Sequence, residues 1–451
     1  MRTNRPLFRI LALLFAFVLI GAACGRDDED SADAPAATDD GDDGGDDTSD
    51  TTAAEGTDED DSGGELATAP GFDGSTIKVG IVTPQTGGVE VIGNPLTTGN
   101  QVYFDYVNDE LGGIAGQYQI ETVVVDSQYD ATVGLQQYNA IKDDVVMFAQ
   151  ILGTPVVNTV LEQLRQDNIV AAPASLDSFW VREQNLLPIG GPYQVQAINA
   201  MDWWINEGGG STDATVCTMI QDDPYGEAGQ EGVEFAAEQL GFEVAATARF
   251  GATDTDFTAQ VGQLSEANCE VVFLVSTPTG TGGILGVAAA QNFTPQWIGQ
   301  SPTWIGLLAA SPLAEYLQAN FKVVAEGTEW GDESVPGMAD MIARQEQYAP
   351  DQGPDYYFAF GYNQAQAVVQ VLEAAVENGD LSREGIIEAM NSLDTLTFDG
   401  LSGDYEWGAP EDRNPPRAST IFEVDPEKPF GLGVVARDYE SEAADAFEFE
   451  G

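Results

Sequence analysis

The residues best suited to bind a small molecule lie in six short loops, each of which follows an apolar, strand-like run. The loops are rich in hydroxyl groups, glycine and aromatic rings, and they contain few charges. Such a lining suits a small ligand that is neutral or forms hydrogen bonds. Because the same residue types also build ordinary turns, the prediction depends on the position that the six loops share. They cover residues 83–88, 152–155, 173–176, 222–226, 277–280 and 300–304.

Alternating strand-like and helix-like patterns must position these loops. The apolar run 77–82 is followed by a glycine-rich loop and by apolar residues at helical spacing up to Val107. The alternation continues to residue 172 and begins again after residues 190–192. It predicts parallel sheets covered by helices on both faces. Ligands of such sheets bind beyond the carboxyl ends of the strands, where the six loops are expected.

The composition argues against other kinds of site. The 451-residue chain has 75 acidic and 16 basic side chains, and its formal charge of -59 would repel nucleic acid. It has no histidine, which removes the commonest general base and all histidine-based metal sites. The adjacent acids Asp222 and Asp223 are nominal acid–base candidates, but acids in such a loop usually cap a helix or face solvent. We therefore predict a binding protein with no catalytic residue, metal or cofactor.

The N-terminus has the architecture of an export signal. Arg2, Arg5 and Arg9 precede an uncharged apolar run at residues 10–20, which is followed by small residues and Cys24. The run is shorter than the roughly 20 apolar residues that a transmembrane helix needs. The pattern predicts a cleaved signal peptide at the start of the chain and an extracytoplasmic location.

The segments that border the expected folded region are acidic and polar. The signal peptide is expected at 1–23, and residues 24–72 consist mainly of Asp, Gly, Thr, Ser and Ala. A segment of this kind cannot bury enough apolar surface to fold, and its like charges extend it. We expect a linker over 24–72 and an acidic tail at 441–451.

The small residues directly before Cys24 resemble the lipobox of bacterial lipoproteins. In that family the cysteine becomes the lipidated N-terminus of the mature chain. Gly21 departs from the pattern, since the family usually has Leu at this position. The resemblance implies a lipid anchor at Cys24 on the outer face of the cell membrane, and secretion as a free protein is the alternative.

A series of motifs runs through the chain from about residue 75 to residue 435. They are Ile77-Lys78-Val79-Gly80-Ile81, Thr86-Gly87-Gly88, Gly112-Gly113-Ile114, Pro173-Ala174, Asp223-Pro224-Tyr225-Gly226, Asp256-Phe257-Thr258, Gly361-Tyr362-Asn363-Gln364-Ala365 and Gly400-Leu401-Ser402-Gly403. In order and spacing they resemble the branched-chain amino acid (Leu/Ile/Val) binding family of ABC-transporter substrate-binding proteins. Together the motifs are specific, whereas any one of them is not.

The resemblance implies the periplasmic binding protein type I fold, an α/β fold of two doubly wound parallel-sheet lobes joined by a multi-strand hinge. Lobe 1 is expected at 73–192 and 322–397, and lobe 2 at 193–321 and 398–440. The lobes would close on a small metabolite, such as an amino acid or amide, and deliver it to the permease subunits of an ABC importer. The alternative is a receptor with the same clamp that signals to a partner protein.

The resemblance also assigns the loops their roles. The ligand's polar head would be held by lobe 1, and lobe 2 would close over it with an aromatic ring and two further loops. Trp304, just after one of these loops, is the tryptophan expected nearest the ligand. The predicted site comprises Gly153, Thr154, Ala174, Ser175, Leu176, Tyr225, Thr277, Ser301 and Trp304.

Two of these positions depart from the amino acid binders. Ser301 stands where they commonly place an acid to meet the ligand's ammonium, and Leu176 stands where a hydroxyl helps to hold the carboxylate. A buried ammonium without a carboxylate partner is costly. We therefore expect leucine, isoleucine and valine to bind weakly, unless Asp222, Asp223 or Glu329 supplies the missing charge.

Cys217 and Cys269 are expected on adjacent strands of lobe 2 if the strand order is the usual one. An exported protein could join them in a disulfide, and two separate buried thiols are the alternative.

Overall fold

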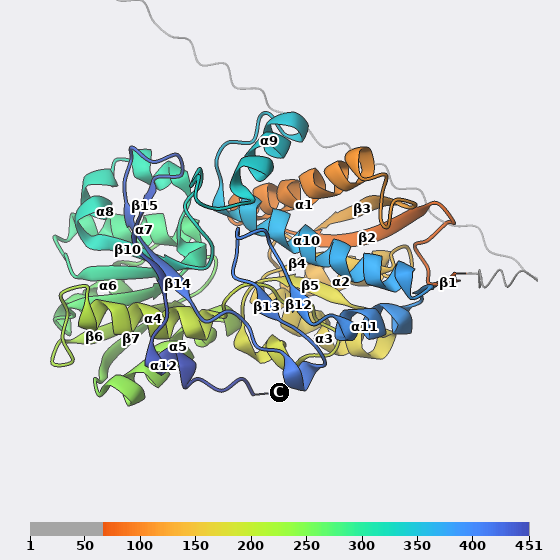
Figure 1. Cartoon of the computed structure of the whole chain (residues 1–451). Coiled ribbons are helices and arrows are strands. Elements are labelled where there is room, and N and C mark those ends of the chain that lie inside the picture. Colours follow the sequence, from red (N-terminus) through yellow and green to blue (C-terminus); the bar gives the residue numbers. More distant parts are fainter. Residues whose placement is uncertain (1–65, 451) are drawn as a thin grey trace, which may run out of the picture. The chain divides into compact units, whose positions relative to one another are not determined.

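The computed structural model describes residues 66–450, and the fold is described for this part of the chain (Figure 1). The expected signal peptide, Cys24 and most of the acidic linker lie outside the described residues. Among the helices of residues 66–450, none combines the length and the apolar character needed to cross a bilayer.

Lobe 1 is built on a four-stranded parallel sheet with the order β3-β2-β4-β5. One face packs on α1 and α10, which lie side by side, and the other face packs on α2 and α3 (Figure 1). The bounds are β2 (Thr76–Thr83), α1 (Glu90–Glu110), β3 (Gln119–Asp126), α2 (Ala131–Ile141), β4 (Met147–Leu152), α3 (Thr154–Asp167), β5 (Ala171–Ala174), α9 (Met338–Tyr348), α10 (Tyr356–Glu377) and α11 (Arg383–Ser392).

Lobe 2 is built on a seven-stranded sheet with the order β15-β14-β10-β9-β8-β6-β7. Its strands are parallel except for β14, which runs antiparallel to both of its neighbours, β10 and the edge strand β15. The bounds are α4 (Tyr193–Asn206), β6 (Val216–Gln221), α5 (Pro224–Leu240), β7 (Val244–Phe250), α6 (Thr258–Glu266), β8 (Val271–Val275), α7 (Pro278–Ala290), β9 (Gln296–Gln300), α8 (Ala314–Asn320), β10 (Phe321–Ala325), β14 (Ser419–Val424), β15 (Leu432–Tyr439) and α12 (Glu442–Asp445).

The sequence explains why these sheets are buried on both faces. All residues of β4, β6 and β8 are buried, and most of them are apolar without alternation. Continuous apolar strands of this kind are typical of parallel sheets covered by helices. The predicted class, two doubly wound α/β units, is confirmed.

Cys217 and Cys269 form a disulfide in lobe 2. Cys217 lies on β6, and Cys269 lies just before β8, which pairs with β6 as the usual strand order requires. The sequence left open a disulfide or two separate buried thiols, and the structure has the disulfide.

The segments that connect the sheets are held by buried hydrogen bonds. Arg413 is fully buried and donates to the backbone oxygens of Glu183 and Leu186 at 2.7 and 3.2 Å. Its guanidinium also lies over the ring of Trp407, 4.3 Å from the centroid. The connecting segment around residues 405–414 is therefore fixed against the segment that follows β5. The expected residue boundaries between the lobes stay a prediction.

Candidate ligand-binding site

The carboxyl ends of strands from both sheets face a cavity with an empty volume of about 530 Å³, which we call the front chamber. Its walls are the loops after β3, β4, β5, β6, β8, β9 and β10, together with parts of α1, α4 and α10. The structure therefore brings together eight of the nine residues predicted for the site, while their role in binding stays a prediction. They are Gly153, Thr154, Ala174, Ser175, Leu176, Tyr225, Thr277 and Ser301.

Three hydroxyl groups form a connected cluster in the wall of the front chamber. The Oγ1 of Thr154 lies 2.6 Å from the Oγ of Ser175, which lies 3.3 Å from the hydroxyl of Tyr193. All three side chains are buried. Burial raises the pKa of Tyr193, so its hydroxyl stays neutral and keeps its proton at ordinary pH. Two of the three hydroxyl protons are used within the cluster, and the proton of Tyr193 remains to donate to an acceptor in the chamber.

Two helices begin at the front chamber without a side-chain cap. Helix α3 starts at Thr154 after Gly153, and α7 starts after Thr277, and neither N-terminus is capped by a side chain. The backbone N–H groups and partial positive charge of such helix ends favour an anionic group. Gly153 is required here, because its φ of 102° is left-handed and a Cβ would lie 2.6 Å from the Tyr129 ring.

Glu326 is the one ionisable acid among the residues that line the front chamber, and no Lys or Arg joins it there. It accepts a hydrogen bond from Gln196 Nε2 at 2.7 Å and another from the hydroxyl of Tyr356. Burial raises its pKa to about 7, so this carboxyl can hold its proton closer to neutral pH than an exposed glutamate does.

Sequence reasoning missed Glu326, although a usable signal was present. The residue directly follows the strand Phe321–Ala325, which is apolar except for Lys322, as the other site residues follow their strands. The acids considered instead have other partners. Asp222 pairs with Arg249 at 3.1 Å, and Asp223 caps α5 by accepting from the backbone N–H of Gly226 at 3.1 Å.

Glu329, the third acid considered from the sequence, pairs with Lys428 at 2.6 Å. It lines a second cavity, which we call the rear chamber and which has an empty volume of about 810 Å³. This chamber lies between α9, α10 and the sheet of lobe 2. The two chambers share Ser301, Glu326, Tyr356 and Phe360, so they adjoin.

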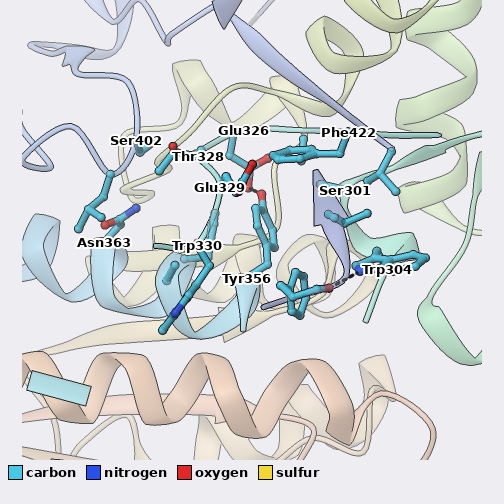
Figure 2. A pocket seen from close by; sticks show the side chains of 18 of the residues that line it. Ser301, Trp304, Glu326, Thr328, Glu329, Trp330, Tyr356, Asn363, Ser402 and Phe422 are labelled. Atoms are coloured by element: carbon cyan, nitrogen blue, oxygen red, sulfur yellow. Dashed lines mark hydrogen bonds between the residues drawn. The ribbon is translucent and has the colours of Figure 1, made fainter. Parts of the chain in front are cut away.

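Trp304, the ninth predicted residue, lines the rear chamber and not the front one (Figure 2). Its ring is buried, and its Nε1 donates to the backbone oxygen of Phe430 at 3.0 Å. The hydroxyl of Tyr357 in turn donates to the backbone oxygen of Trp304 at 2.8 Å. The 3₁₀ turn after Ser301 thus directs this ring away from the hydroxyl cluster.

Comparison with known proteins agrees with this architecture. The sequence matches the family described as periplasmic binding protein over residues 76–429. A comparison with curated proteins finds no match. Among solved structures, a fatty acid ABC transporter substrate-binding protein from Thermomonospora curvata is 27% identical, with a TM-score of 0.80 over 85% of this chain and 97% of that one.

Two more distant structures share the fold. A branched-chain amino acid ABC transporter protein from Thermus thermophilus with bound valine is 17% identical, with a TM-score of 0.69 over 82% of this chain and 98% of that one. A leucine binding protein from Thermotoga maritima is also 17% identical, with a TM-score of 0.66 over 80% and 98%. The chain belongs to the periplasmic binding protein family and is a substrate-binding protein of the ABC-transporter type.

Proposed function

We propose that the protein captures an acidic and largely apolar solute, such as a fatty acid, in the front chamber and delivers it to the permease of an ABC importer. The observation that carries this proposal is the hydroxyl cluster of Thr154, Ser175 and Tyr193 beside two uncapped helix N-termini. These groups can hold a carboxylate although no basic side chain lines the chamber.

The chemistry of the chamber favours a carboxylate over a neutral head group. Hydrogen bonds from hydroxyl and N–H groups to an ionised acceptor are about twice as strong as those between neutral groups. Both helix N-termini add positive potential at the same place. Aliphatic and aromatic side chains make up most of the remaining lining, which suits an apolar body. The 27% identical relative, which is described as a fatty acid binder, supports the same ligand class.

An amino acid fits the front chamber less well. The ammonium would need a carboxylate, and the position expected to supply one is Ser301. Glu326 is the only candidate among the lining residues, and both of its oxygens already accept hydrogen bonds. A ligand with an ammonium group against Glu326 is the second candidate, and the two ligand classes predict opposite effects of pH.

Closure of the two lobes would bury the ligand. In the structure the hydroxyl of Thr279, on α7 of lobe 2, donates to the backbone oxygen of Gly88, in a loop of lobe 1, at 2.8 Å. This bond crosses between the lobes beside the front chamber and supports a closed state. We infer that hinge bending opens this contact for ligand exchange and that the closed form docks on the permease.

Calorimetry with decanoate and leucine as separate probes tests the ligand class. We expect decanoate to bind and leucine to bind much more weakly, and the Ser175→Ala variant should lose about tenfold in affinity for decanoate. Recovered ligand should be chemically unchanged by mass spectrometry, because we expect no catalysis. Sub-micromolar leucine binding together with no decanoate binding would overturn the proposal in favour of an amino acid.

We also propose that Cys24 carries a lipid anchor and that the acidic linker tethers the domain to the outer face of the membrane. The Cys24→Ala variant should be released into the medium or remain an unprocessed precursor. Fractionation of cells with an antibody to the domain measures this. Normal membrane retention of a correctly cleaved variant would disprove the anchor.

A further inference from the structure

We propose that the rear chamber binds the apolar chain of the ligand while the front chamber holds its carboxylate. This inference rests on the proposed function, and it assigns a second cavity to the same ligand. The two chambers would then form one elongated site that passes Glu326 and Tyr356. The ligand would be an acid with a chain long enough to continue past these two side chains.

The lining of the rear chamber matches an alkyl or aryl chain. One wall is contributed by apolar residues of the lobe 2 sheet and its loops, and the opposite wall by residues of α9 and α10. Met338 and Met341 lie on the second wall, and methionine side chains adapt readily to chains of different shape. Aromatic and aliphatic residues make up most of the lining, including Trp304, Phe360, Phe422 and Phe430. The polar residues of the lining are Ser301, Glu326, Thr328, Glu329, Asn363 and Ser402.

The junction between the chambers is compatible with passage of an apolar chain. It is made by residues that line both cavities, and two of them, Glu326 and Tyr356, are hydrogen-bonded to each other. Figure 2 shows these two side chains next to each other. Because Glu326 is buried and its oxygens accept bonds from Tyr356 and Gln196, its polar atoms are satisfied without the ligand. A methylene chain can therefore pass beside this pair without leaving a polar group unpaired.

One buried amide lies at the far end of the rear chamber, where a long chain would reach it. Figure 2 shows Asn363 and Ser402 on the opposite side of the chamber from Ser301 and Trp304. The Asn363 side chain is only 5% exposed, and its Oδ1 has no hydrogen-bond partner within the protein. An apolar chain that fills the chamber to its end would lie against this unpaired oxygen, which weakens its binding.

A chain-length series with straight-chain acids from butanoate to dodecanoate tests the inference by calorimetry. For the unmodified domain we expect the affinity to rise by up to about fourfold for each methylene that enters the rear chamber. Ala359 of α10 lines the rear chamber. The Ala359→Trp variant, which fills part of the chamber, should abolish this gain for long acids and leave butanoate binding unchanged. Ala359→Ser is the matched control, because it changes the same position without filling the cavity.

The Asn363→Leu variant is expected to strengthen the binding of long acids, whereas Ala359→Trp is expected to weaken it. If the chain reaches Asn363, replacement of the amide by an apolar side chain should strengthen dodecanoate binding by about tenfold and leave butanoate binding unchanged. Both variants should first be shown to melt cooperatively, and Ala359→Leu replaces Ala359→Trp if the latter does not fold.

The possible outcomes separate this inference from the proposed function. If no acid of any length binds, both fail. If short and long acids bind with equal affinity, or if Ala359→Trp and Asn363→Leu leave dodecanoate binding unchanged, the front chamber keeps its role and the rear chamber loses the one proposed here.

Discussion

The front and rear chambers adjoin, yet they are built in different ways. The front chamber is made by loops at the carboxyl ends of parallel strands, where helix N-termini and hydroxyl groups converge. The rear chamber is made by the side of a helix pair and by the antiparallel edge of the lobe 2 sheet, and its lining is mainly apolar. The strand ends therefore supply the polar groups of the front chamber, and the helix pair and the sheet of lobe 2 supply the apolar lining of the rear chamber.

The largest effect on binding is expected when hydroxyl groups of the front chamber are removed. In the double variant Thr154→Val, Ser175→Ala, two hydroxyl groups that face the carboxylate are lost, and we expect acids of every length to lose about 3 kcal/mol of binding free energy. Calorimetry should show the same loss for butanoate and dodecanoate. Thr159→Val is the matched control, because Thr159 is an exposed threonine on the same helix that bonds to Pro155. A loss confined to long acids would contradict the division of roles.

The second largest loss of binding free energy is expected when the ring of Tyr225 is removed. It packs edge-to-face on Tyr193 with centroids 5.1 Å apart, and its hydroxyl lies 3.4 Å from the backbone oxygen of Ser276. Tyr225→Ala should weaken binding by about 2 kcal/mol, because the ring supports the hydroxyl cluster and covers the ligand. Tyr225→Phe should change binding little, since the hydroxyl bond is long. Unchanged affinity of a folded Tyr225→Ala protein would remove this ring from the site.

A change of pH is expected to have a smaller effect on ligand affinity. Glu326, with its pKa raised to about 7, is neutral below that pH and ionised above it. The negative charge would repel a carboxylate ligand, so affinity for decanoate should fall by about tenfold between pH 6 and pH 8.5. Glu326→Gln should make the affinity independent of pH in this range. An amine ligand would instead bind more tightly as pH rises, which distinguishes the two classes.

Asp355 provides the matched control for this experiment. Burial also raises its pKa to about 7, but it caps α10 and lines neither chamber. Asp355→Asn should therefore keep the pH dependence of binding. Both acids have folded-state pKa values above their ordinary values of 4.5 and 3.8, so between those values and about pH 7 the folded protein binds more protons than the unfolded chain. Stability should fall as pH rises through that window, and each variant should reduce this slope in thermal melts.

The smallest effect on binding is expected from the disulfide. The bond closes a loop over a sequence separation of 52 residues, and its removal in Cys217→Ala, Cys269→Ala should lower the free energy of unfolding by about 3 kcal/mol. Neither cysteine lines a chamber, so ligand affinity should stay within twofold. Denaturant titration measures the first quantity and calorimetry the second. A large loss of affinity would show that the geometry of the ligand site depends on the disulfide, contrary to this prediction.

The contrast between the chambers also explains what could be predicted from the sequence. The loops of the front chamber carry a local signal, because Thr154, Ser175 and Thr277 each follow an apolar strand within a few residues. The α/β class follows from the same alternation. Glu326 could have been found in this way, but the short strand before it was not identified as one.

The rear chamber had no comparable signal. Its walls combine residues separated by long stretches of chain, such as Met341, Phe422 and Asn363, and no spacing pattern connects them. Trp304 shows the same difficulty at short range, because it is only three positions from Ser301 and yet its ring belongs to the other cavity. Side-chain direction after a turn depends on packing that a sequence pattern does not contain.

The disulfide of lobe 2 has a consequence for the order of maturation. The sequence contains three cysteines, and Cys217 and Cys269 use two of them. Disulfides form in oxidising compartments, so this bond is expected to form after export. A third thiol at Cys24 could then attack the pair and exchange with it. Early attachment of a lipid at Cys24 would remove that thiol, so the anchor would also protect the correct pairing while the domain folds.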